Sequence, residues 1–269
     1  MPKVSVIISF YNRIDYLKFV LAGFERQTFR DFEIIIADDG SGPEIVKEIE
    51  KLSLKLSFPV LHLWHEDKGF RKNKILNRAI TSANSDFLIF IDGDCVPHRE
   101  FVNEHFEYRY EGKCFTGRRV NLSEKFTKGL NEEDIKNGYL ENSLHLMVSD
   151  GLFGKSDYVE RGFYVQNKFL RKYLNKKKRG LLGCNFSIHK KDLLAINGFD
   201  ERYELPSIGE DSDIQYRLEL KGVKIESLNN IAVQYHLHHR LQERPQENLD
   251  LFAKIKESGE AYTPFGINK

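Results

Sequence analysis

The chain has 269 residues, of which 41% are hydrophobic and 30% are charged, an ordinary composition for a globular protein with a substantial core. Its 41 basic and 40 acidic residues give a net charge of +1, which offers no global electrostatic reason to expect a nucleic-acid partner. No apolar run approaches the roughly 18 residues of a bilayer-spanning helix, so we expect no membrane-embedded segment.

The first half of the chain alternates strand patterns with helix patterns. Strands are predicted at 4–10, 32–37, 60–64 and 87–91, and helices at 12–26, 43–56 and 73–83. This alternation predicts right-handed βαβ units and an α/β fold with a mostly parallel sheet. The loops that follow the strands then meet at one edge of the sheet, where open α/β sheets bind their ligands.

The second half is less regular. Residues 123–178 are polar and contain several glycines, and their elements cannot be placed from the sequence. Around this segment we predict strands at 114–116, 185–188, 223–227 and 231–235, and helices at 100–110, 191–196 and 211–221.

An acidic motif follows the fourth predicted strand. Asp92 and Asp94 are separated only by Gly93, where the apolar run 87–91 ends. Two carboxylates this close repel each other unless a cation lies between them, and their oxygen atoms suit Mg²⁺ or Mn²⁺, which bridge phosphate oxygens. The motif therefore indicates a site for a metal and a diphosphate; the alternative is an ordinary Asp-Gly turn.

Two further strand ends carry polar groups that suit a nucleotide. Asp38 and Asp39 end the second strand, and such carboxylates accept hydrogen bonds from a ribose or a base, although Asp is also a common helix cap. Lys68 and Arg71 lie in a glycine turn ahead of a helix, where cations and the helix N-terminus bind phosphate oxygens; a solvated charged turn is the alternative.

Candidate chemical groups also lie late in the chain. Glu210 and Asp211 begin a predicted helix and are candidates for the general base that deprotonates a sugar hydroxyl, although acids at a helix N-terminus need no function. His236 and His238 follow an apolar strand and would point the same way along an extended chain, either as Mn²⁺ ligands or as a plain polar strand end. The sequence has no His-Glu-x-x-His or Cys-x-x-Cys pattern that would predict zinc.

A basic stretch spans residues 168–179, where seven cations are mixed with aromatic and aliphatic residues. This mixture suits an anionic membrane surface or an anionic acceptor, and a solvated basic face is the alternative. The three scattered cysteines and the absence of a leader pattern favour a cytoplasmic location, peripheral to the inner face of the membrane if the basic stretch contacts it.

Taken in order, the motifs resemble those of the inverting glycosyltransferases of family 2. The matching segments are Val6–Asn12, Asp38–Ser41, Asp92–Asp94 and Gly209–Asp211, and the segments Lys68–Arg71 and Gly198–Glu201 further resemble the chondroitin-polymerase type of domain. The resemblance covers about residues 3–120 and 180–240. It implies the GT-A fold, a single Rossmann-like domain with helices around a mostly parallel central sheet and an irregular or helical acceptor-side region.

The resemblance also implies site residues and cofactors. The donor would be a nucleoside-diphosphate sugar, with UDP favoured, and Mn²⁺ or Mg²⁺ would be the metal. The residues that would hold the donor are Ser9, Phe10, Tyr11, Asn12, Asp38, Asp39, Lys68, Arg71, Asp92 and Gly93. The residues that would hold the metal are Asp92, Asp94 and His236 or His238. Asp211 would be the base of an inverting displacement, and Glu210 would orient the acceptor.

Residues 1–120 would form the nucleotide-sugar-binding half of the domain, residues 121–240 its acceptor-binding and catalytic half, and residues 241–269 a C-terminal tail. The acceptor implied is a glycan or a lipid-linked glycan in polysaccharide or lipopolysaccharide synthesis. The Gln-x-x-Arg-Trp motif of processive synthases is missing, so we expect transfer of one sugar.

Two other functions are weighed against this one. A sugar-phosphate nucleotidyltransferase would carry a glycine-rich loop after the first strand, but that loop reads Phe10-Tyr11-Asn12-Arg13. A non-catalytic nucleotide-sugar-binding protein would have no need of Asp94 and Asp211. An oxidoreductase of the Rossmann type is disfavoured because no Gly-x-Gly-x-x-Gly follows the first strand.

Overall fold

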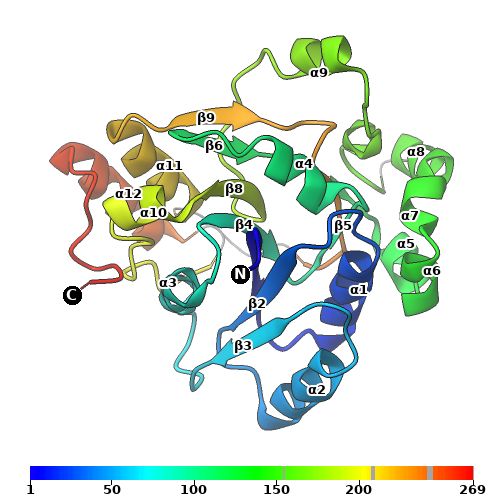
Figure 1. Ribbon diagram of the computed structural model, residues 1–269, viewed down its shortest axis with the longest axis horizontal. Helices are drawn as coiled ribbons and strands as arrows, with labels where there is room; N and C mark the ends of the chain where they lie inside the picture. The colour runs from blue at the N-terminus through cyan, green and yellow to red at the C-terminus, as the bar shows by residue number, and fades with distance from the viewer. Residues whose placement is uncertain (154, 207–209, 241–244, 269) are drawn as a thin grey trace.

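The computed structural model describes residues 1–153, 155–206, 210–240 and 245–268. It contains a seven-stranded sheet in the order β3-β2-β1-β4-β8-β6-β9 and a three-stranded sheet in the order β5-β10-β7 (Figure 1). The strands of the larger sheet are β1 Val4–Phe10, β2 Phe32–Asp38, β3 Val60–Trp64, β4 Phe87–Asp92, β6 Lys113–Thr116, β8 Asn185–His189 and β9 Lys224–Ser227.

The first half of the larger sheet is parallel. Strand β1 pairs in parallel with both β2 and β4, and β2 pairs in parallel with β3. The carboxyl ends of these four strands therefore lie at one edge of the sheet. Strand β8 then pairs antiparallel to β4, so it begins at that same edge. The predicted α/β fold with a mostly parallel central sheet is confirmed.

Helices cover both faces of this sheet. The helices are α1 Ile14–Glu25, α2 Pro43–Ser53, α3 Lys72–Ser82, α4 Phe101–Glu107, α10 Lys190–Ala195 and α11 Glu210–Leu220. Side chains alternate along β1, so Val6 and Ile8 join the core under α1, whereas Ile7 joins the core under α3 and α11. Strands buried on both faces explain the continuous apolar runs of the sequence.

The smaller sheet joins the two halves of the chain. Its strands are β5 Cys95–Pro97, β7 Arg118–Asn121 and β10 Val233–His236. Strand β10 lies between the other two, antiparallel to β5 and parallel to β7, and His236 is opposite Cys95 in the register. This pairing brings the end of β10 next to the acidic motif that precedes β5.

Residues 123–178 form a series of short helices: α5 Glu124–Lys128, α6 Glu132–Lys136, α7 Tyr139–Asn142, α8 Leu144–Leu152, η1 Val159–Gly162 and α9 Lys168–Leu174. Helix α9 has no buried residue and stands apart from the sheets at the top of Figure 1. Within the described residues, no helix combines the length and the apolar character that crossing a bilayer requires.

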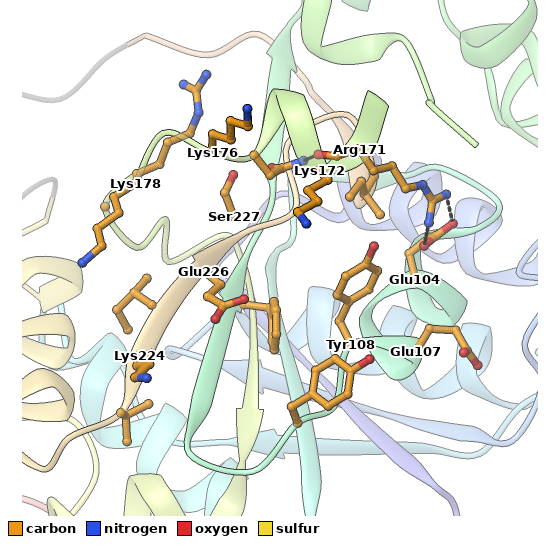
Figure 2. Close-up of a pocket in the computed structure, with 18 of the residues that line it drawn as sticks. Glu104, Glu107, Tyr108, Arg171, Lys172, Lys176, Lys178, Lys224, Glu226 and Ser227 are labelled. Atoms are coloured by element: carbon orange, nitrogen blue, oxygen red, sulfur yellow. Dashed lines mark hydrogen bonds and ion pairs between the residues drawn. The ribbon is translucent and has the colours of Figure 1, made fainter. Parts of the chain in front are cut away.

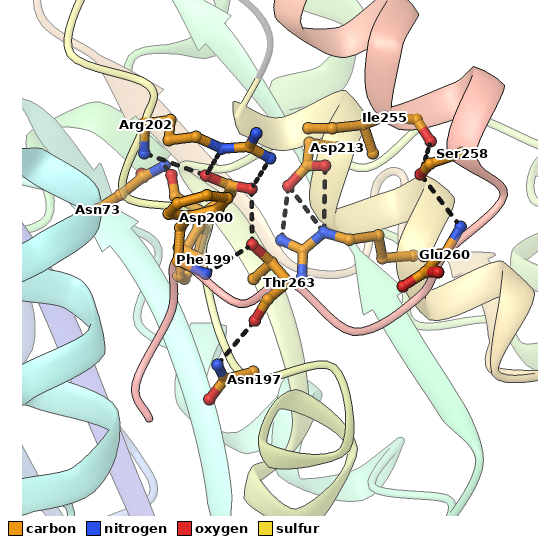
Figure 3. A network of polar contacts seen from close by, with 12 residues as sticks. Asn73, Asn197, Phe199, Asp200, Arg202, Asp213, Ile255, Ser258, Glu260 and Thr263 are labelled. Carbon is orange, nitrogen blue, oxygen red and sulfur yellow. Dashed lines mark hydrogen bonds and ion pairs between the residues drawn. The ribbon is translucent and has the colours of Figure 1, made fainter. Parts of the chain in front are cut away.

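The residues after 240 include the helix α12 Gln246–Ser258 and a segment that returns to the core (Figure 3). Thr263 accepts a hydrogen bond from Asn197 Nδ2 on its carbonyl oxygen and donates one from Oγ1 to Asp200 Oδ2, both at 2.7 Å. The buried side chain of Arg217 binds Asp213 beside them. These contacts fix the backbone around Asp200 and the described part of α11 against the returning segment.

Candidate active site

A cavity of about 500 Å³ lies at the edge where the parallel strands end. Most of the predicted donor-binding residues line it, together with Asp94, Lys72 and His239: Ser9, Phe10, Tyr11, Asp39, Asp92 and Gly93. The loops after β1, β2 and β4 thus meet as the parallel topology requires. The predicted residues Asn12, Asp38, Lys68 and Arg71 do not line this cavity.

A smaller recess adjoins the cavity. Its lining includes Glu210, Asp211 and Gly183. Ser9, Lys72 and Asp92 line both the recess and the cavity, so the two hollows share a wall. The acids from the two halves of the sequence therefore lie in one site.

Asp94 lies beside two histidines. Its Oδ2 atom is 3.5 Å from Nε2 of His236 and 3.2 Å from Nε2 of His239. One donor atom from each of these three residues lies within 4.8 Å of the others. A carboxylate and two imidazoles are a donor set that suits Mn²⁺, so the residues present fit the expected metal.

The electrostatics of this group follow from its burial and its hydrogen bonds. Burial would raise the pKa of Asp94, but hydrogen bonds from His236 and His239 outweigh it and hold that pKa well below its ordinary value. The hydrogen bond to Asp94 raises the pKa of His239. The carboxylate is therefore kept in the charged form that a metal requires.

His238 does not belong to this group, although the alternation of an extended chain predicted that it would. Strand β10 ends at His236, so the alternation stops there. The backbone N–H of His238 donates to Thr127 Oγ1, and its carbonyl oxygen accepts from the hydroxyl of Tyr16. The turn that follows brings His239 to Asp94 instead.

Asp92, the other acid of the motif, is engaged by a lysine rather than by the histidines. Its Oδ1 atom accepts a hydrogen bond from Ser9 Oγ and lies 3.2 Å from Nζ of Lys72. The same Nζ is 3.8 Å from Oε1 of Glu210. Burial alone would lower the pKa of Lys72, but Asp92, Glu210 and Asp211 raise it above its ordinary value. Lys72 is therefore a permanent cation between the two groups of acids.

Asp211 is held by a glycine. Its Oδ2 atom accepts a 2.8 Å hydrogen bond from the backbone N–H of Gly183, just before β8. Burial raises the pKa of Asp211, while Lys72 and this hydrogen bond oppose the rise. A carboxylate with a raised pKa is a better proton acceptor, which suits a general base.

Glu210 is more strongly perturbed. Burial, followed by the negative charge of Asp211, raises its pKa to about 7 against the opposing charge of Lys72. Its Oε2 atom is buried and has no hydrogen-bond partner in the described part of the chain. Perturbed carboxyl groups in a recess are typical of functional sites.

The two acids of the turn after β2 have different surroundings. Asp38 is fully buried, and its carboxylate binds Ser41 and His62. Asp39 lines the cavity, accepts a hydrogen bond from the backbone N–H of Arg71 and lies 2.7 Å from Nε2 of His65. Asp38 therefore shapes the turn, and Asp39 faces the space for a ligand.

The other predicted donor-site residues lie around this turn. Asn12 accepts a hydrogen bond on Oδ1 from the backbone N–H of Gly42. Lys68 is exposed and pairs with Glu66, whose carbonyl oxygen accepts from Arg71. These residues support the loops around the cavity, and the lysine and arginine that line it in the described part of the chain are Lys72 and Arg13.

Lys72, His239 and Arg119 were not predicted from the sequence. The charge of Arg119 lowers the pKa of Asp211, and its Nη1 atom lies 3.3 Å from Sγ of Cys184. Nothing in the local pattern of β7 distinguishes this arginine. The only signal for Lys72 was its place in the cationic turn before α3.

Comparisons with known proteins agree with this geometry. A family model described as "Glycosyl transferase family 2" matches residues 5–193, and one described as "N-terminal domain of galactosyltransferase" matches residues 165–240. The chain is 25% identical to chondroitin synthase of Escherichia coli over 242 residues, which are 87% of this chain and 34% of that protein. It is 29% identical to chondroitin synthase of Pasteurella multocida over 233 residues, which are 81% of this chain and 23% of that protein. The chain thus spans about a third of the first of these relatives and about a quarter of the second.

The solved structures show the same fold. The structure of residues 1–349 of TarS of S. aureus in complex with UDP superposes with a TM-score of 0.59 at 18% identity, covering 96% of this chain and 65% of that one. The TarS complex with UDP-GlcNAc gives a TM-score of 0.57 at 19% identity, covering 94% and 66%. The chain has the GT-A fold predicted from the motifs, and because the family model covers most of its length, it belongs to glycosyl transferase family 2.

Proposed function

We propose that this chain transfers one sugar from a nucleoside-diphosphate sugar, with UDP as the nucleotide, to a hydroxyl group of a glycan, with inversion at the anomeric carbon. One observation carries the proposal. Ser9, Lys72 and Asp92 line both the donor-sized cavity and the recess that contains Glu210 and Asp211. A donor in the cavity therefore has its reacting end next to the acids.

The donor would lie in the cavity with its nucleoside toward Asp39 and its diphosphate toward Lys72 and Asp94. Asp39 has the free lone pairs to accept hydrogen bonds from the nucleoside, and Lys72 supplies a positive charge for the phosphates. The solved TarS structures with UDP and UDP-GlcNAc support UDP as the nucleotide.

Asp94, His236 and His239 would hold Mn²⁺ or Mg²⁺. When bound, such a metal supplies positive charge that stabilises the leaving diphosphate. Asp92 contributes through Lys72, which it orients by a salt bridge.

Asp211 would act as the base. The acceptor oxygen forms a bond to the anomeric carbon, its proton passes to the Asp211 carboxylate, and the bond from the anomeric carbon to the diphosphate oxygen breaks with its electron pair. The hydrogen bond from Gly183 fixes the orientation of this carboxylate. Glu210 would hold another hydroxyl of the acceptor through its unpartnered Oε2 atom.

The acceptor would be a glycan or a lipid-linked glycan. The names of the relatives support this class, among them a Campylobacter jejuni protein named GalNAc(5)-diNAcBac-PP-undecaprenol beta-1,3-glucosyltransferase, 27% identical over 49% of this chain and 45% of that protein. The exposed side chains of Phe169, Leu170 and Tyr173 on α9 would contact the membrane surface that carries such an acceptor.

The donor can be tested by thermal denaturation. UDP, GDP, dTDP and CMP are each added with and without Mn²⁺, because a ligand that binds the native state raises the melting temperature. UDP with Mn²⁺ is expected to give the largest rise. If no nucleoside diphosphate raises it, the assignment of the donor cavity is wrong.

Asp211→Asn tests the base. The amide has nearly the same shape but cannot take the acceptor proton, so transfer should fall by about 10²- to 10⁴-fold while binding of UDP with Mn²⁺ is kept. Transfer at the wild-type rate would remove the assignment of Asp211.

A further inference from the structure

A second and larger hollow lies on the side of the molecule opposite β3 in the sheet order. It has a volume of about 1310 Å³ and runs along the edge strand β9, between α4 and α9 on one side and α11 on the other. In Figure 2, Lys172, Lys176 and Lys178 lie along its rim, and Lys224 and Glu226 project from β9 beneath them. We call this hollow the basic groove.

The groove carries positive charge that the described residues do not fully neutralise. Six of its lining cations have no ion-pair partner among the described residues: Lys168, Lys172, Lys176, Lys178, Arg179 and Lys224. Of the four lining acids, Glu104 is bound by Arg171 at 2.8 Å and Glu226 by Lys113 at 2.7 Å. Only Glu107 and Glu219 remain to oppose the six cations.

One end of the groove is rich in arginine. The Nε atom of Arg179 is buried and has no hydrogen-bond partner in the described part of the chain. Arg118 lies nearby and donates a 2.7 Å hydrogen bond to the carbonyl oxygen of Gly180. Burial, together with the positive charges of Arg179 and Arg161, lowers the pKa of Arg118 to about 10. Arg161 pairs with Glu160 at 3.6 Å, but Arg118 and Arg179 have no ion-pair partner among the described residues, and two such arginines favour an anionic ligand.

This end of the groove is connected to the base. Residues 180–183 run along α11, where the backbone N–H of Leu181 donates to Gln215 Oε1 at 2.7 Å and that of Gly183 donates to Asp211 Oδ2. Gln215, which lines the groove, is one helical turn from Asp211. This end of the groove therefore lies one helical turn of α11 away from the proposed base, although no described residue lines both the groove and the recess.

We propose that the basic groove binds phosphate groups carried by the glycan acceptor, so that the substrate class of this enzyme is a phosphate-bearing acceptor. The inference rests on the proposed function for the identity of the molecule, but the groove itself can be tested without it. Lysine ammonium groups spread along a hollow suit the charge of phosphate esters, and Arg179 offers the donors for a phosphate oxygen.

The geometry separates this role from membrane contact. The most exposed apolar side chain of α9 is Phe169, 88% exposed, and it does not line the groove; neither do Leu170 and Tyr173. The lysines at Lys168 and Lys172 on the same helix do line it. The lysines of α9 therefore line the groove, whereas its apolar side chains are exposed outside it.

Calorimetric titration with inorganic tripolyphosphate, without divalent ions or nucleotide, tests the groove directly. The double variant Lys172→Gln/Lys176→Gln and the variant Arg179→Gln remove lining charges, and Lys177→Gln is the matched control because Lys177 lies in the same stretch but outside the groove. We expect the first two proteins to lose affinity by about tenfold or more and the control to keep it. Equal affinities in all four proteins would overturn the proposal.

Two parallel measurements separate the outcomes. Sedimentation with vesicles of phosphatidylglycerol or phosphatidylcholine tests whether the groove binds the phosphate of a lipid headgroup. Binding to phosphatidylglycerol vesicles without binding to tripolyphosphate would overturn the acceptor proposal. Titration with UDP and Mn²⁺ should give the same affinity in the wild type and the groove variants. Failure of UDP to bind the wild type would count against the proposed function and leave the groove result intact.

Discussion

The backbone N–H of Gly183 donates a 2.8 Å hydrogen bond to Oδ2 of Asp211, and a Cβ atom at position 183 would lie 2.1 Å from Oδ1 of the same carboxylate. Only a glycine allows the strand β8 to begin this close to α11. The position of the proposed base is therefore set by the absence of a side chain.

Gly183→Ala should displace the Asp211 carboxylate. Because small displacements of a catalytic group cost about 10²-fold in rate, we expect transfer to fall by that order while UDP and Mn²⁺ still bind. Steady-state rates and a titration with UDP measure the two effects. Gly129→Ala is the control, since the nearest atoms to its added Cβ are 3.5 Å away; equal rates in the two variants would contradict this account.

His239→Ala should weaken metal binding, and His238→Ala should not. Nε2 of His239 lies 3.2 Å from Asp94 Oδ2, whereas the described contacts of His238 are made by its backbone. We expect Mn²⁺ affinity to fall at least about tenfold in the first variant, the lower end of the loss caused by removing a supporting partner. Electron paramagnetic resonance of free Mn²⁺ measures it. A larger loss in His238→Ala would show that the metal lies elsewhere.

Lys72→Met should destabilise the protein. It removes the cation between Asp92 and Glu210 and leaves their charges buried together, at a cost of about 3 kcal/mol in the free energy of unfolding at pH 8. Urea denaturation without divalent ions measures the change. Lys74→Met is the matched control, because Lys74 is exposed on the same helix. Equal stabilities of the two variants would mean that the acids need no cation.

The stability of the protein should depend on the protonation of Glu210. Burial raises the pKa of this carboxyl from 4.5 to about 7. The stability that its proton contributes is fully present below pH 4.5 and is lost as the pH rises through about 7, because the unfolded chain has already released the proton.

Glu210→Gln should not show this loss. Its free energy of unfolding, relative to that of the wild type, should therefore rise by about 2–3 kcal/mol between pH 4.5 and pH 8. Urea denaturation over this range, without divalent ions, provides the measurement. Parallel pH profiles for the two proteins would show that Glu210 titrates normally.

The sequence was most informative where strands end. The apolar run that became β4 located Asp92 and Asp94, and parallel topology then required Asp39 and Ser9 to lie near them. Such predictions succeed because the carboxyl ends of parallel strands share one edge of the sheet. The predicted strand at 60–64 has the same bounds as β3.

The sequence was least informative where the position of a residue depends on contacts with residues far along the chain, or where the helices are short. His239 could not be identified, because strand alternation applies only as far as His236, and the turn beyond it is fixed by contacts with Thr127 and Tyr16. The helices of residues 123–178 are too short to develop a clear apolar period; α7 has four residues and α5 has five.

The interleaving of β8 and β10 with the first half of the chain has a consequence for biosynthesis. Strand β8 pairs with one edge of β4, and β10 pairs with β5. The backbone hydrogen bonds of residues 87–97 therefore cannot all form until residues 185–189 and 233–236 have been synthesised. A nascent chain on the ribosome thus presents an apolar, unpaired strand edge from the synthesis of β4 until β8 has been made, and such an edge promotes aggregation. Recombinant production should accordingly improve when chaperones that shield such edges are supplied.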